Sequence, residues 1–260
     1  MNSLPLPRFA TVLSQPDLRH VAHILSLALV LAMAASSTSA DTSPWIALDV
    51  GHSLQHSGAL SARGRTEFAF NRDLATVIAR VLHQRAFRVQ LIGSDGTLNN
   101  LHARPQQAAG AAILLSIHHD SAQPQYLEEW VVDGQNQRYT DRFSGFSLFI
   151  SRRNPQFARS LACATQLGAH LRAAGFQPSL HHAEAIPGEN RPFADRENGV
   201  YVFDDLVVLR TATQAAILLE AGVIVNRSEE WALRQLRTQT RMATALADGF
   251  VACFKSQPPL

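Results

Sequence analysis

The chain has 260 residues and a formal net charge of +2; 46% of its residues are apolar and 17% are charged. This composition supports a substantial hydrophobic core and excludes an intrinsically disordered chain. The small net charge gives no indication of a nucleic-acid partner, and the length fits one large domain or two small ones.

Residues 1–40 have the pattern of a secretory signal peptide. Arg8 and Arg19 lie in a weakly basic region, an apolar segment covers 21–35, and small residues precede a cleavage point after Ala40. The apolar segment is about 15 residues long, shorter than the ~20 that cross a bilayer, which argues against the alternative of a retained membrane anchor. We therefore expect a mature domain, residues 41–260, that is periplasmic or, as a second choice, secreted, with no membrane association after signal removal.

The remaining sequence alternates between strand-like and helix-like segments. Expected strands are Trp45–Val50, Phe87–Ile92, Ala112–Ile117, Gly145–Ser151 and Ala215–Leu219, with shorter apolar runs at Val200–Phe203 and Leu206–Leu209. Expected helices are Phe68–Arg85, Leu101–Gly110, a segment capped by Asn154 that ends near Ala174, and a segment capped by Ser228 that ends near Phe254. This alternation predicts a single α/β domain with a mostly parallel sheet and helices on both faces.

Two polar segments and two cysteines give weaker signals. No structure is predicted for Ser121–Ser144. The segment His181–Gly199 is interpreted either as a flap that shapes a substrate groove or reaches the active site, or as a solvated surface loop. Cys163 and Cys253 fall in helix-like segments, which favours two small buried apolar residues over a disulfide, although export permits one.

Three expected strands end in residues that bind metals or transfer protons. They are His52 after the first strand, His118, His119 and Asp120 after the third, and Glu220 after the last. The carboxyl ends of parallel strands share one edge of the sheet. Glu67, at the start of the first helix, belongs to the same edge, so these side chains are expected to converge.

The convergent residues suit zinc chemistry. Catalytic zinc takes three His or carboxylate ligands and leaves a position for water, whose pKa falls to about 7. His52, Glu67 and His118 supply such a set, and Glu220, outside it, suits proton transfer to a leaving amine. Each residue alone also has a structural interpretation, such as a first-turn carboxylate favoured by the helix dipole. One site that explains all four together favours a single zinc ion.

Three segments resemble the signature blocks of zinc-dependent N-acetylmuramoyl-L-alanine amidases, which are cell-wall enzymes. They read IALDVGHS…GALSARGRTEFAFN, LLSIHHDS and LVVLRTATQAAILLEAGVIVNRSEE, in the family's order. The resemblance implies zinc ligands His52, Glu67 and His118 and a catalytic Glu220. It also implies cleavage between the MurNAc lactyl group and L-alanine, with peptidoglycan or muropeptides as substrate. Arg104 matches a frequent family arginine that we interpret as structural.

The first block departs from the family pattern, because it lacks a proline before the glycine and further glycines after His52. We therefore expect a less open loop there. His119 is an alternative ligand to His118, disfavoured because neighbouring residues of a strand point to opposite faces.

Some relatives plug their zinc with an inserted helix. Ser121–Ser144, with Glu128 and Glu129, is therefore a candidate inhibitory element, although a short one. Two other functions stay open at this stage: an exported zinc peptidase or amide hydrolase acting on a non-wall substrate, and a catalytically silent wall-binding module. The sequence identifies no protein activator.

Overall fold

The computed structural model describes residues 44–255, so the predicted signal peptide lies outside the described residues. The strands are β1 (Trp45–Val50), β2 (Arg88–Ile92), β3 (Ile113–Asp120), β4 (Glu128–Val132), β5 (Gln135–Tyr139), β6 (Ser147–Ile150), β7 (Phe193–Asp195), β8 (Val200–Val202) and β9 (Ala215–Val223). The helices are α2 (Glu67–Gln84), α3 (Ala103–Gln107), α4 (Phe157–Ala173), α5 (Val207–Arg210), α6 (Arg227–Leu233) and α7 (Leu236–Lys255), with short 3₁₀ turns η1 (Pro124–Tyr126) and η2 (His181–Ala183). None of these helices has the length and apolar character needed to cross a bilayer.

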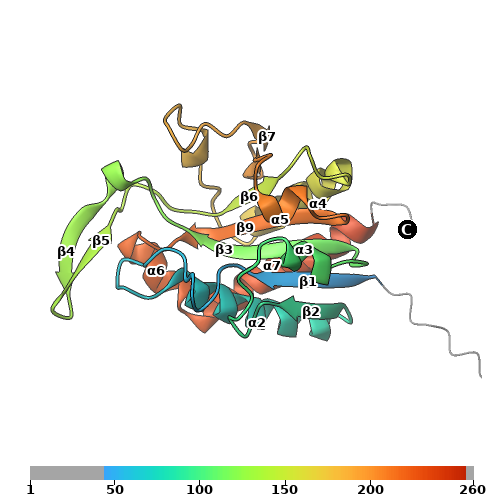
Figure 1. Cartoon of the computed structure of the whole chain (residues 1–260), viewed down its shortest axis with the longest axis horizontal. Coiled ribbons are helices and arrows are strands. Elements are labelled where there is room, and N and C mark those ends of the chain that lie inside the picture. Colours follow the sequence, from blue (N-terminus) through green and yellow to red (C-terminus); the bar gives the residue numbers. More distant parts are fainter. Residues whose placement is uncertain (1–43, 256–260) are drawn as a thin grey trace, which may run out of the picture. The chain divides into compact units, whose positions relative to one another are not determined.

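Within residues 44–255 the large sheet has seven strands in the order β2-β1-β3-β9-β6-β8-β7 (Figure 1). The pairs β1–β2, β1–β3, β3–β9 and β6–β8 are parallel, whereas β6–β9 and β7–β8 are antiparallel. The sheet is therefore mostly parallel, which confirms the predicted single α/β domain.

Helices cover both faces of the sheet, and alternation along each strand explains why. Ile113, Leu115 and Ile117 of β3 are fully buried in one cluster with residues of α2, α4 and α7. Leu114, between them, belongs to a second cluster with residues near α3 and α5. A strand buried on both faces reads as a continuous apolar run, as this one does.

A disulfide joins Cys163 of α4 to Cys253 of α7, with the two Cα atoms 4.9 Å apart. The favoured expectation of two unlinked buried cysteines is therefore wrong. The helix-like setting of each cysteine carries no information about which helices pack together, and that packing is what brings the two sulfur atoms within reach.

The segment for which no structure was predicted contains the β4–β5 hairpin, which extends away from the large sheet at the left of Figure 1. Asp133 and Gly134 form its turn, both with positive φ, as the type I′ turn of a two-residue hairpin requires.

The final helix also differs from the prediction, because it is divided into α6 and α7. Its cap is Asn226, whose side chain accepts hydrogen bonds from the backbone N–H groups of Ser228 and Glu229. Asn154 is likewise not a helix cap. Its side chain donates to the carbonyl oxygens of Leu209 and Gln214, and α4 begins only at Phe157.

Candidate metal centre

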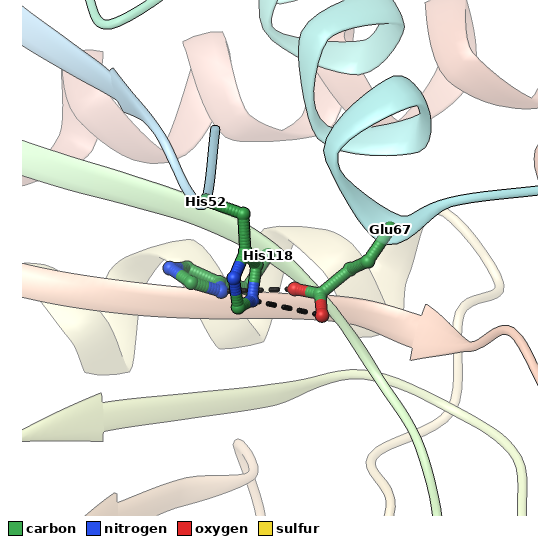
Figure 2. A group of neighbouring side chains, drawn as sticks. All are labelled: His52, Glu67 and His118. Atoms are coloured by element: carbon green, nitrogen blue, oxygen red, sulfur yellow. Dashed lines mark hydrogen bonds and ion pairs between the residues drawn. The ribbon is translucent and has the colours of Figure 1, made fainter. Parts of the chain in front are cut away.

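Three predicted ligands meet at one edge of the sheet (Figure 2). His52 follows β1, His118 lies near the end of β3, and Glu67 is the first residue of α2. Each offers one ligand atom, and these atoms all lie within 4.8 Å of one another. The third strand was predicted to end at Ile117, before His118, but β3 continues to Asp120, so His118 lies within the strand.

The Glu67 carboxylate contacts both histidine rings, one with each oxygen. Its Oε2 lies 2.9 Å from His52 Nε2, and its Oε1 lies 3.0 Å from His118 Nδ1. Glu67 is also held in place, since its Oε2 accepts a hydrogen bond from the backbone N–H of Ala59 at 3.1 Å. The side chains of His52 and His118 remain 31% and 18% exposed, so one side of the cluster is open to a substrate.

Two glycines make room for this convergence. A Cβ atom at Gly51 would lie 2.3 Å from the ring of His118. A Cβ atom at Gly58 would lie 2.3 Å from Glu67 Oε2, and Gly58 has a φ of 76° that favours glycine. His52 itself has a φ of 68°, which is uncommon for a residue with a side chain. Backbone strain of this kind concentrates at functional sites.

Arg104 holds the loop that presents His52. Its buried guanidinium donates to Asp49 Oδ1 and to the carbonyl oxygen of Val50, each at 2.6 Å, and also to the carbonyl oxygen of His52. Asp49 in turn accepts a hydrogen bond from Ser116 at 2.7 Å. These contacts agree with a structural role for Arg104. The arginine also fixes the backbone of His52, a candidate metal ligand.

The residues fit a zinc ion. Burial alone would raise the pKa of Glu67, but hydrogen bonds and charge interactions with His118 and His52 outweigh it and hold that pKa well below its usual range. The carboxylate is therefore ionised at neutral pH, as a ligand must be. Two imidazoles and one carboxylate form a usual donor set for catalytic zinc.

Glu220 lies beside this cluster, in the strand next to β3. The register pairs it with His118 of β3 and with Ser147 of β6, so the three side chains lie in a row across one face of the sheet. Its Oε2 is buried and has no hydrogen-bond partner within residues 44–255. Burial, reinforced by the negative charges of Asp120 and Glu67, raises the pKa of Glu220 well above its usual value. A carboxyl group with a raised pKa suits proton transfer near neutral pH.

His119 is directed to the opposite face from His118. It is buried against α2, where its Nδ1 lies 2.8 Å from Asn71 Oδ1. Burial lowers its pKa to about 3, so it is neutral. It takes no part in the cluster of His52, Glu67 and His118.

The polar segments Ser121–Ser144 and His181–Gly199 lie in different environments. Glu128 and Glu129, the candidate inhibitory carboxylates, are exposed on the β4–β5 hairpin, and neither belongs to the three-residue cluster. By contrast, His181 and His182 are buried and lie within 3.1 Å of Asp120. That part of the segment is not a solvated loop. The adjacent histidine pair in a polar stretch was the available sequence signal, but it did not identify the partner.

A mostly parallel α/β sheet with a His–Glu–His cluster and a free carboxylate at one edge defines a class of metal-dependent hydrolases. Residues 46–252 match the family model described as N-acetylmuramoyl-L-alanine amidase. The chain belongs to this family. It is a hydrolase that cleaves the amide bond between the MurNAc lactyl group and L-alanine in peptidoglycan.

Solved structures share the fold. The catalytic domain of CwlV, an amidase from Bacillus (Paenibacillus) polymyxa var. colistinus, is 24% identical, with a TM-score of 0.61 over 82% of this chain and 99% of that one. Ami1 from Mycobacterium smegmatis is 20% identical, with a TM-score of 0.64 over 82% of this chain and 98% of that one. The CwlD amidase from Clostridioides difficile, solved in complex with the GerS lipoprotein, is 16% identical, with a TM-score of 0.60 over 82% of this chain and 100% of that one. No significant match was found among curated proteins.

Proposed function

We propose that His52, Glu67 and His118 hold one zinc ion and that Glu220 is the catalytic carboxylate of the amidase. The proposal rests on one observation, the different positions of the carboxyl groups of Glu67 and Glu220 relative to the two histidines. Glu67 contacts both imidazoles. Glu220, paired with His118 across the β3–β9 register, keeps a buried oxygen that has no hydrogen-bond partner in the described part of the chain.

The roles of the acids follow from their environments. His52, Glu67 and His118 would hold the zinc ion, which would supply Lewis acidity toward the scissile carbonyl and the attacking water. Glu220 takes a proton from the attacking water and returns it to the L-alanine nitrogen as the C–N bond breaks. Glu67 stays ionised throughout, because its histidine partners hold its pKa low.

A cleft beside the ligands gives the substrate a place to bind. It has a volume of about 380 Å³ and lies between the Gly58–Ser61 segment and the Asn136–Arg138 segment of the β4–β5 hairpin. Because Gly58 packs against Glu67 and His52, the cleft reaches the candidate zinc ligands. We infer that part of the peptidoglycan substrate lies in this cleft, which assigns the hairpin to binding instead of inhibition.

The substrate also implies a location. Peptidoglycan lies outside the cytoplasmic membrane, so we propose that the signal peptide is removed after Ala40 and that the enzyme works in the periplasm. Amino-terminal sequencing of the exported protein tests this proposal. A protein that begins at Asp41 is expected, and one that retains Met1 would contradict it.

Product analysis tests the proposed activity. The exported protein is incubated with purified peptidoglycan, with and without a zinc chelator, and soluble products are identified by mass spectrometry. We expect stem peptides that begin at L-alanine, absent with the chelator and absent with the Glu220→Gln variant. Cleavage within the stem peptide, or products unaffected by the chelator, would overturn the proposal.

A further inference from the structure

A second cluster of metal-binding side chains lies close to the first. Within the described residues it consists of Asp120, at the end of β3, and His181 and His182, in the η2 turn. The Nε2 atoms of both histidines approach the same oxygen, Asp120 Oδ2, at 3.1 and 3.0 Å. Both histidines are buried, with 5% and 7% of their surface exposed.

The three facing atoms are at ion-pair distance but outside hydrogen-bond geometry. Asp120 Oδ2, His181 Nε2 and His182 Nε2 are all buried, and none has a hydrogen-bond partner among the described residues. A buried polar atom without a well-formed hydrogen bond destabilises a fold, and here three such atoms face one another at ion-pair distance. A cation between them satisfies all three at once.

The spacing also suits a metal ion. Ligand atoms about 2.0–2.1 Å from a tetrahedral zinc lie about 3.3 Å from each other. The observed separations of 3.0 and 3.1 Å need only a small outward adjustment to reach this value.

The other polar atom of each side chain is held by a neighbour. His182 Nδ1 lies 2.9 Å from Glu189 Oε2, and His181 Nδ1 lies 2.7 Å from Ser179 Oγ. Asp120 Oδ1 accepts a hydrogen bond from the backbone N–H of the next residue at 2.7 Å. Partners of this kind at the outer nitrogen orient the inner nitrogen of metal-bound histidines. The arrangement therefore holds both Nε2 atoms beside the same carboxylate oxygen, Asp120 Oδ2.

We propose that Asp120, His181 and His182 form a binding site for a second divalent transition-metal ion, with zinc favoured by the two-imidazole, one-carboxylate donor set. The ion fixes the segment that carries η2 against the end of β3. His182, Glu189 and Glu220 line one cavity of about 160 Å³, so this segment forms part of the wall around Glu220. The site is separate from the His52–Glu67–His118 cluster, and its occupancy does not depend on the proposed amidase mechanism.

Metal stoichiometry tests this inference. The exported protein is dialysed to equilibrium against buffered micromolar free zinc, and bound zinc is measured by mass spectrometry of the metal. We expect two ions per wild-type chain, one in His182→Ala, and one in His52→Ala. His102→Ala, which removes an exposed histidine outside both clusters, is the matched control and should keep two.

A second measurement guards against loss of folding in these variants. Asp120→Asn removes the charge with little change in shape, and circular dichroism identifies the folded variants. In a His52→Ala background, cobalt(II) should give tetrahedral absorption bands that disappear when Asp120→Asn is added. One zinc per wild-type chain that is lost in His52→Ala but kept in folded His182→Ala would overturn the second site, as would an unchanged stoichiometry in folded His182→Ala or Asp120→Asn.

Discussion

Replacing Arg104 with methionine should show how much this residue stabilises the fold and how much it supports the candidate metal centre. The substitution keeps an unbranched side chain but removes the guanidinium that pairs with Asp49 and donates to the carbonyl oxygens of Val50, His52 and Leu98. Asp49 and Arg104 have 0% and 2% of their side-chain surface exposed, so water cannot replace the lost partner. Removing one member of a buried ion pair costs about 3–5 kcal/mol, and we expect a loss of that size.

Urea denaturation monitored by tryptophan fluorescence, with the disulfide intact, measures this loss. Arg104→Lys should cost less than Arg104→Met, because it keeps the charge, although an ammonium group lacks the planar fork that reaches several acceptors. Adding Asp49→Asn to Arg104→Met should recover stability, since no buried charge is then left unpaired. A cost below about 1 kcal/mol for Arg104→Met, typical of an exposed pair, would refute the reasoning. So would a double variant that is no more stable than the single one.

The same variants report on the metal centre. Because Arg104 holds the carbonyl group of His52, loosening it should weaken zinc binding about 10–100-fold, the usual effect of disturbing a group that supports a ligand. Zinc affinity is measured under conditions where circular dichroism shows the variant to be folded. Unchanged affinity in folded Arg104→Met would restrict this arginine to a role in stability.

Four further outcomes are expected. Glu220→Gln should lower kcat about 10²–10⁴-fold with normal zinc content, and normal turnover would exclude Glu220 as the proton carrier. Gly58→Ala should lose zinc, because the added methyl group overlaps a ligand oxygen at 2.3 Å; full zinc occupancy in metal analysis would contradict this steric argument. Replacing both Cys163 and Cys253 with alanine should cost about 2–4 kcal/mol in urea denaturation, since their link closes a long loop. Burial raises the pKa of Glu229 to about 7, although hydrogen bonds from two backbone N–H groups partly oppose this rise. Between about pH 4.5 and 7, Glu229 therefore keeps its proton in the folded chain but loses it in the unfolded chain. Stability should therefore fall as pH rises from about 4.5 to 7, and Glu229→Gln should flatten this dependence in titrated urea curves.

The sequence was sufficient to predict the elements that carry the candidate metal site. His52 follows β1 and His118 lies in β3; both strands are buried on both faces and have clear apolar runs, and their parallel pairing brings the two residues to one edge. Glu67 starts a helix with clear apolar periodicity. Each ligand is thus placed by an element whose own pattern was visible in the sequence.

The β4–β5 hairpin was not predicted because its pattern lacks a buried face. Trp130 and Val132 are only half-buried, so no residue of β4 is fully buried. Val131, on the other side of the strand, is apolar yet has 68% of its surface in solvent, so apolar residues do not mark one face. The remaining signal was the Asp133–Gly134 turn, which favours a two-residue hairpin. The Cys163–Cys253 link had no local signal, because the two cysteines are 90 residues apart and meet only through the packing of their helices.

The register between β3 and β9 connects the hydrophobic core to the chemistry. Glu220 faces the metal cluster only because Ile217 and Leu219, on the opposite face, are fully buried beneath the helices. A slip of one residue would turn these apolar side chains to the site and place the carboxylate in the core. Each large apolar side chain contributes about 1.5–3 kcal/mol on burial, so the core strongly disfavours the slip. His181 and His182 have no such support, since they lie outside the regular strands, and a metal ion bound with Asp120 would supply the constraint that strand register supplies to Glu220.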